Sequence, residues 1–125
     1  MALQAGDTIT FERTFTEEDV ERFTKVSGDA GTHHMTPDEQ GRLVVQGLLT
    51  ATLPTKVGGD HNVLARQANF EFLRPVFTTD TIICNVKIEK FEKQRDERTA
   101  IEASFSCENQ KGKAVLQGSF AGVIL

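Results

Sequence analysis

A carboxylate and an imidazole stand five residues apart, at Asp29 and His34, in a glycine-rich segment. An aspartate and a histidine that converge on one water molecule can hold it and deprotonate it, because imidazole accepts protons near neutral pH. Gly47 lies in the apolar stretch 43–51, in the first turn of an expected helix. A backbone N–H there can polarise a thioester carbonyl, and glycine allows a close approach. Together these residues predict a site that adds water across an α,β-unsaturated thioester, or removes it.

The same residues also have ordinary structural explanations. An aspartate after a helix-ending glycine is common, because its short polar side chain satisfies the backbone of a turn. A histidine in a loop is often simply solvated. The spacing gains weight only because an apolar helix that begins with a glycine follows it.

Composition limits the classes of function. The 125 residues predict one domain spanning 1–125, and 38% hydrophobic with 26% charged residues favour a folded core. The net charge of -4, with both signs mixed, argues against a nucleic-acid partner, and no apolar run is long enough to span a membrane. The segment 1–7 lacks the features of a signal peptide, and Cys84 and Cys107 do not make a disulfide scaffold, so we expect a cytoplasmic protein. The three histidines lack a metal-ligand spacing, which predicts no metal site.

The first half of the chain predicts a strand and two or three helices. Residues 8–15 alternate as a strand does. Thr16 and Asp19 form a capping-box pattern at the start of a helix, which Gly28 should end in a left-handed conformation, leaving Asp29 in a loop. The apolar stripe of this helix is expected to contain Val20, Phe23 and Val26. Residues 36–40 predict a single helical turn, and residues 45–57 predict a longer helix that is apolar nearly all round, hence buried, and bent by Pro54.

The second half predicts strands at 66–73, 81–91, 99–107 and 114–124. Cys84 and Cys107 should lie opposite one another in a hairpin, and Gly118 and Gly122 should mark bulges or close approaches. About five antiparallel strands and one buried helix are best satisfied by a curved sheet wrapped round that helix. The predicted class is therefore α+β, with a single hot-dog domain.

Two stretches resemble a known family. The sequence Ser27-Gly28-Asp29 through His34, followed by Val45-Gln46-Gly47-Leu48, is similar to the motifs Ser-Gly-Asp-x-Asn-Pro-x-His and His-Gly-Met of the MaoC-like, (R)-specific enoyl-CoA hydratases. Residues 68–81 are similar to the family's Phe-x-x-Pro-Val strand and the turn after it.

The resemblance implies roles for three residues: Asp29 and His34 as catalytic residues and Gly47 as the group that binds the carbonyl. It also implies a homodimer that hydrates trans-2-enoyl thioesters, carried on CoA or acyl carrier protein, to (R)-3-hydroxyacyl thioesters. No metal or redox cofactor is implied.

The chain departs from this pattern at several positions. Gly31-Thr32 replaces Asn-Pro, which should loosen the loop, and Gln46 replaces a histidine, so it can hydrogen-bond but not titrate. The segment from His34 to Gly47 is short, which predicts an altered acyl pocket. Thr55 stands where family members often carry a small hydroxyl residue; it could hold Asp29 or the water, or be an ordinary core threonine.

One further histidine and two alternative functions have to be considered. His33 is expected to face solvent or a neighbouring chain, since the spacing to Asp29 favours His34. A hot-dog thioesterase would use a carboxylate to activate water at the carbonyl instead of at C3. A non-catalytic acyl-CoA-binding module would bind the thioester without turnover.

Overall fold

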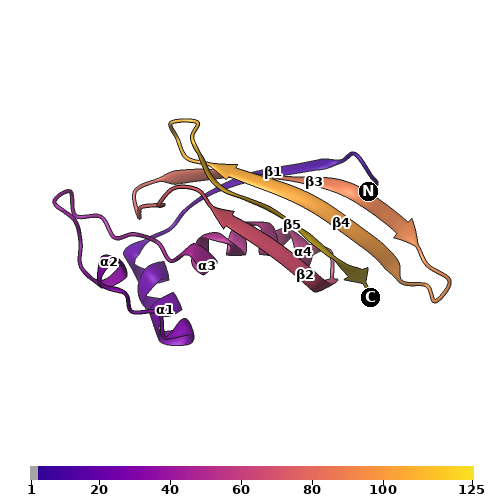
Figure 1. Cartoon of the computed structure of the whole chain (residues 1–125), viewed down its shortest axis with the longest axis horizontal. Coiled ribbons are helices and arrows are strands. Elements are labelled where there is room, and N and C mark those ends of the chain that lie inside the picture. Colours follow the sequence, from indigo (N-terminus) through magenta and orange to yellow (C-terminus); the bar gives the residue numbers. More distant parts are fainter. Residues whose placement is uncertain (1–2) are drawn as a thin grey trace.

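The structure is a computed structural model that describes residues 3–125. Met1 and Ala2 lie outside the described residues, and they belong to the segment 1–7, in which no signal peptide is expected. Its elements are β1 (Thr8–Thr14), α1 (Glu17–Ser27), α2 (Thr32–Met35), α3 (Gly47–Thr50), α4 (Thr52–Asp60), β2 (Val63–Phe72), β3 (Thr81–Lys93), β4 (Thr99–Glu108) and β5 (Ala114–Ile124). The strands form one antiparallel sheet in the order β1-β3-β4-β5-β2. The sheet curves over α3 and α4, while α1 and α2 lie at one end (Figure 1). This is the predicted α+β arrangement.

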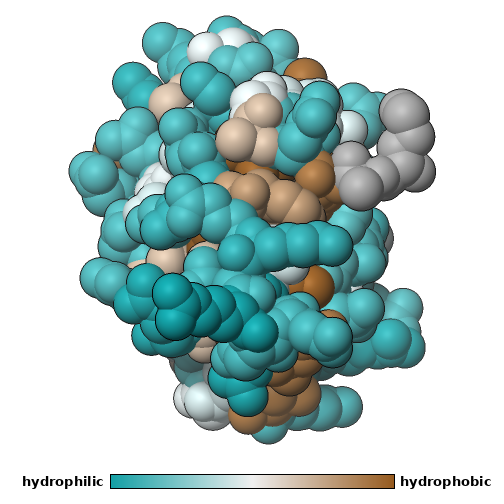
Figure 2. Space-filling view, turned by 90° about the vertical axis from the view of Figure 1, so that its right-hand side faces the viewer, coloured by the Kyte–Doolittle hydropathy of each residue, from teal (hydrophilic) through white to brown (hydrophobic). Residues whose placement is uncertain are grey.

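The surface at the opposite end, where the β3–β4 hairpin lies, is mainly hydrophilic and shows hydrophobic residues as separate patches (Figure 2). Within residues 3–125, no helix has both the length and the apolar character needed to cross a membrane.

Alternating side chains of the central strands build the core. Ile82, Cys84, Val86 and Ile88 of β3 and Ile101, Ala103, Phe105 and Cys107 of β4 are all buried, which confirms the predicted inner faces. Cys84 and Cys107 are directly paired across the hairpin, and both are free thiols. The contact with Cys107, together with burial, raises the pKa of the Cys84 thiol well above its ordinary value.

Two glycines of β5 allow the edge strand β2 to approach closely. A Cβ added at Gly118 would lie 2.0 Å from the backbone oxygen of Asn69, and one at Gly122 would lie 2.3 Å from that of Leu64. Such distances are impossible for a real side chain, so the predicted close approach at both glycines is confirmed.

The capping box of α1 is present as predicted. The Thr16 hydroxyl accepts from the Asp19 N–H at 3.1 Å, and the Asp19 carboxylate accepts from the Thr16 N–H at 2.9 Å. The hydrogen bond from the Thr16 backbone is the main cause that lowers the pKa of the Asp19 carboxyl. The prediction that Val26 belongs to the buried stripe is wrong, because it is 86% exposed. Six residues of helix rotate it by about 240° from Val20, away from the core.

The helical turn predicted at 36–40 is also wrong, since the turn lies earlier, at α2. Thr36 has an extended backbone, as expected before Pro37, because proline disfavours the helical conformation of the preceding residue. The Asp38 carboxylate then accepts from the N–H groups of Gln40 and Arg42, which fixes a turn.

The long helix differs from the prediction in its bounds and in its continuity. It begins at Gly47, is divided into α3 and α4 at Ala51, and extends to Asp60. Pro54 has no N–H to donate to the carbonyl of Thr50, which accounts for the division at that turn. The helix is not enclosed on all sides, because Leu48 is 60% exposed.

Candidate active site

Asp29 is held just beyond the end of α1. Gly28 closes the helix with φ of 77°, as predicted, and places Asp29 in a loop. The Asp29 N–H donates to the Ser27 hydroxyl at 3.0 Å, and its Oδ1 accepts from the Gly31 N–H at 3.4 Å. The remaining oxygen, Oδ2, lies 3.6 Å from Nε2 of His34, and the side chain is 51% exposed. The structure therefore brings the two predicted residues together.

His34 is buried and its ring is fixed by the backbone. It lies in the single turn α2 and not in an exposed loop, and it is 6% exposed. Its Nδ1 lies 2.6 Å from the carbonyl oxygen of Val44. Because a carbonyl can only accept, Nδ1 carries the hydrogen in this contact, and in the neutral form of the ring Nε2 is therefore the acceptor, facing Asp29. At 3.6 Å the two facing atoms are too far apart for a direct hydrogen bond, so both remain available to a third group.

His33 lies against His34, with 3.9 Å between the two ring centroids. His33 is exposed, as expected, and its ring also crowds Gly31: an added Cβ there would be 3.0 Å from the His33 Cε1. Glycine at position 31 therefore makes room for the histidine pair.

Gln46 ties three segments together at the start of α3. It is fully buried, and its Nε2 donates to the Thr24 hydroxyl at 2.9 Å and approaches the backbone oxygens of Val20 and Asp29 at 3.4 Å each. This amide thus connects the middle of α1 and the Asp29 loop to the helix that begins at Gly47. Its Oε1 has no hydrogen-bond partner among the described residues.

Gly47 is the first residue of α3, and its backbone N–H therefore has no acceptor within the helix. It borders a pocket of about 280 Å³ together with His34, Thr50 and Phe72. A Cβ at Gly47 would lie 2.9 Å from Cε1 of Phe72, so the aromatic ring rests directly on the glycine. His34 and Gly47, two of the residues predicted from the sequence, thus line the same pocket.

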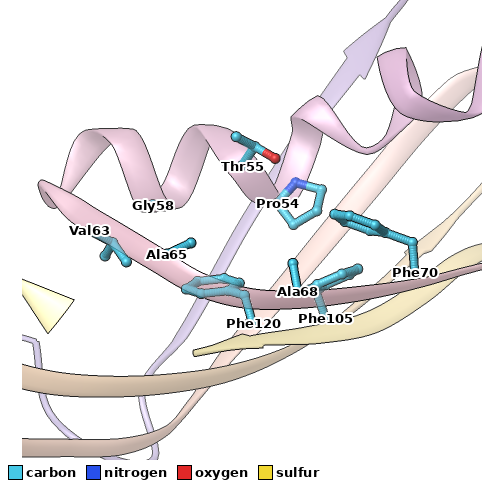
Figure 3. A pocket seen from close by; sticks show the side chains of 9 residues that line it. All are labelled: Pro54, Thr55, Gly58, Val63, Ala65, Ala68, Phe70, Phe105 and Phe120. Carbon is cyan, nitrogen blue, oxygen red and sulfur yellow. The ribbon is translucent and has the colours of Figure 1, made fainter. Parts of the chain in front are cut away.

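Thr55 is not part of this group. Its hydroxyl donates to the Ala51 carbonyl at 2.9 Å, as an ordinary helical threonine does. It lines a separate apolar cavity of about 90 Å³ between α4 and the sheet. Figure 3 shows Pro54 of α4 above Phe70, Ala68 and Phe105, which rise from the strands.

Metal ligation has no support in the described part of the chain, where no three His, Cys, Asp or Glu side chains gather as ligands would. Three parts of the site were not predicted: the Val44 carbonyl, the Phe72 ring and the buried Thr50. Only the position of Thr50, three residues after Gly47, carried a sequence signal, because that spacing places two residues on one helix face.

A scan against models of protein families finds no match, and neither does a search of curated proteins. Solved structures do match. The "(R)-hydratase from A. caviae involved in PHA biosynthesis" is 21% identical with a TM-score of 0.83, covering 99% of this chain and 98% of that one. The unliganded R-hydratase PhaJ1 from Pseudomonas aeruginosa is 21% identical with a TM-score of 0.80, covering 98% and 81%. A MaoC-like dehydratase from Rhodospirillum rubrum is 14% identical with a TM-score of 0.76, covering 98% and 93%.

At these identities the likeness is one of fold. It confirms that the strands and the central helix of this chain are arranged as in hot-dog proteins, among which are R-hydratases and a MaoC-like dehydratase.

Proposed function

We propose that this protein is a hydro-lyase that reversibly hydrates trans-2-enoyl thioesters, on CoA or acyl carrier protein, to (R)-3-hydroxyacyl thioesters. The observation that carries the proposal is the orientation of His34: its Nδ1 is occupied by the Val44 carbonyl, and its Nε2 faces the Asp29 carboxylate at 3.6 Å. The activation of one water molecule requires an acceptor nitrogen and a carboxylate that face one another, and here the nitrogen belongs to a histidine that lines a pocket. The similarity in fold to two R-hydratases supports the same chemistry.

In the proposed reaction, Asp29 and His34 hold the water beside C3 of the bound thioester. As the water oxygen bonds to C3, His34 Nε2 takes a proton from it, and the electrons of the double bond move towards the thioester oxygen. The Gly47 N–H stabilises the charge on that oxygen. The proton on His34 then passes to C2, which completes the addition of water, and the reverse sequence is the dehydration.

The acyl chain is proposed to occupy the apolar cavity of about 90 Å³ behind α4. Phe70 borders this cavity and Phe72 borders the pocket of His34, and their ring centroids are 6.3 Å apart on the same face of β2. A chain that extends from the thioester at Gly47 into the cavity must therefore pass this aromatic pair. Gly58 contributes no side chain to the helix side of this cavity.

We further propose a homodimer. In the described chain β2 stands at one end of the sheet order and carries exposed apolar residues, with Leu64 58% and Phe72 52% exposed. An unpaired apolar edge favours pairing with another strand, and a second copy paired there would lie beside Gly47, which Phe72 contacts. Light scattering at micromolar concentration should give the mass of two chains, and an active monomer would contradict this assembly.

Two free thiols favour a reducing compartment, and a cytoplasmic location is part of this proposal.

The function is tested by incubating the protein with crotonyl-CoA and with longer trans-2-enoyl-CoA substrates and by determining the configuration of the product. Formation of (R)-3-hydroxyacyl-CoA supports the proposal, whereas an (S) product contradicts it. Butyryl-CoA is assayed in parallel for release of free CoA. Hydrolysis of this saturated substrate without hydration would identify a thioesterase, and tight binding of both thioesters without turnover would identify a binding module.

A further inference from the structure

The Thr50 hydroxyl is buried without a hydrogen-bond partner. Thr50 is 3% exposed, and its Oγ1 has no partner within residues 3–125. The residue borders the same pocket as His34 and Gly47. An unpaired buried hydroxyl costs free energy, and proteins retain few such groups without a reason.

Three of the other four threonines in the helices satisfy their hydroxyls on the helix backbone, and the fourth, Thr32, is exposed. Threonine commonly donates to a carbonyl three or four residues earlier. Three of them do so in this chain: Thr24 to Val20 at 2.8 Å, Thr52 to Leu49 at 2.5 Å, and Thr55 to Ala51 at 2.9 Å. Thr50 departs from this behaviour, so its hydroxyl is free for a group that the structure does not contain.

The helix places this hydroxyl near the backbone N–H of Gly47. Residues three apart lie on one helix face, and side chains lean towards the N-terminus of the helix. Thr50 therefore covers the turn that begins at Gly47. It also stands at the fourth helical position, where an apolar residue is favoured opposite the buried Val45. Core packing favours an apolar residue at this position. A contact with the substrate requires a polar group, which Thr50 supplies.

We propose that the Thr50 hydroxyl donates a second hydrogen bond to the thioester carbonyl oxygen, beside the Gly47 N–H. The inference rests on the proposed hydro-lyase function and adds a substrate-binding residue to it. The Phe72 ring rests on Gly47, so it lies in the path of a thioester that approaches this glycine. Entry of the thioester displaces this ring and opens the pocket wall that it shares with Thr50. Because negative charge develops on the carbonyl oxygen during the addition, the second donor acts mainly in the transition state.

The test compares Thr50→Val, which keeps the shape and removes the donor, with Thr50→Ser, which keeps the hydroxyl. Thr52→Val is the matched control, because Thr52 lies two residues further along and its hydroxyl already donates to the Leu49 carbonyl. With crotonyl-CoA, Thr50→Val should lower kcat by about 10²-fold and raise KM a few-fold, because the bond to the carbonyl oxygen is present in the bound substrate and strengthens in the transition state. Thr50→Ser should stay within a few-fold of the wild type, and Thr52→Val should leave kcat unchanged. Thermal unfolding of Thr50→Val should move to a higher temperature, since an unsatisfied buried hydroxyl is removed.

A Thr50→Val protein that is folded and keeps wild-type kcat overturns the inference while leaving the hydro-lyase proposal intact. If the wild type hydrates no enoyl thioester, the hydro-lyase proposal fails. Calorimetric measurement of butyryl-CoA binding then tests whether the Thr50 hydroxyl contacts a thioester. Weaker binding by Thr50→Val than by Thr50→Ser supports the hydroxyl as a donor to the thioester. Equal binding, or no binding by the wild type, overturns it.

Discussion

Replacing either Asp29 or His34 should abolish most turnover, but the two substitutions should differ in their effect on the free energy of unfolding. Asp29→Asn and His34→Ala should each lower kcat by about 10² or more, which is about 2.7 kcal/mol of activation free energy. The double variant should be only a few-fold worse than either single one, because both groups act on the same water molecule.

The stability effects follow from burial. The Asp29 side chain is 51% exposed and asparagine keeps an oxygen for the Gly31 N–H, so Asp29→Asn should change the free energy of unfolding by less than about 0.5 kcal/mol. The His34 side chain is 6% exposed and its ring bonds the Val44 carbonyl, so His34→Ala loses packing and leaves an unsatisfied acceptor. We expect a loss of about 2–4 kcal/mol.

The assay therefore measures initial rates of crotonyl-CoA hydration below the melting temperature of each variant, together with its thermal unfolding. His34→Gln is the informative companion variant, since its amide can donate to the Val44 carbonyl but cannot accept a proton from water. It should be more stable than His34→Ala and equally inactive. His61→Ala, in the loop after α4, serves as the histidine control and should retain full turnover. An active His34→Gln protein, or an active Asp29→Asn protein, would refute the reasoning.

Three further predictions concern the surroundings of the site. A Cβ at Gly58 meets only Val63, at 3.7 Å, so Gly58→Leu should fill the apolar cavity and lower kcat/KM for trans-2-octenoyl-CoA relative to crotonyl-CoA about tenfold or more; an unchanged ratio would show that the acyl chain lies elsewhere. Asp19→Asn should cost about 1 kcal/mol of unfolding free energy at neutral pH. Because the pKa of Asp19 is lowered from 3.8, this difference should persist above that pH and disappear as the pH falls further, which urea unfolding from pH 7 to pH 2 would measure. Gly47→Ala places a methyl group 2.9 Å from the Phe72 ring, so it should lower kcat/KM at least about tenfold while the half-exposed ring moves aside with a small change in melting temperature; full activity would separate Gly47 from the thioester.

The fold was predictable where a local pattern and a tertiary requirement agree. The period-two alternation from Ile82 to Ile88 indicates a strand, and the sheet buries the face that it selects. Thr16, Asp19 and Gly28 fix the ends of α1 through contacts within a few residues. Position 26 was not predictable in this way, because an apolar residue gives no sign of which helix face the core will cover.

The site was predictable in part for the same reason. The helix end places Asp29 next to α2, and spacing selects His34 over His33. The proton position on His34 depends on the carbonyl of Val44, and backbone carbonyls leave no mark in a sequence. Likewise, the lack of a partner for Thr50 becomes visible only after every neighbouring acceptor has been located in space.

The two buried thiols of β3 and β4 can be used to measure how often these central strands separate. Cys84 and Cys107 are the only cysteines of the sequence, lie at 0% and 1% exposure, and pair directly across β3 and β4. With its pKa raised, the Cys84 thiol should react with an alkylating reagent only when these strands separate. A ligand that binds the folded chain lowers the population of that opened form by the factor 1 + [L]/Kd. The rate of thiol labelling can therefore rank acyl thioesters by affinity without any catalytic assay, including in variants that have lost all turnover.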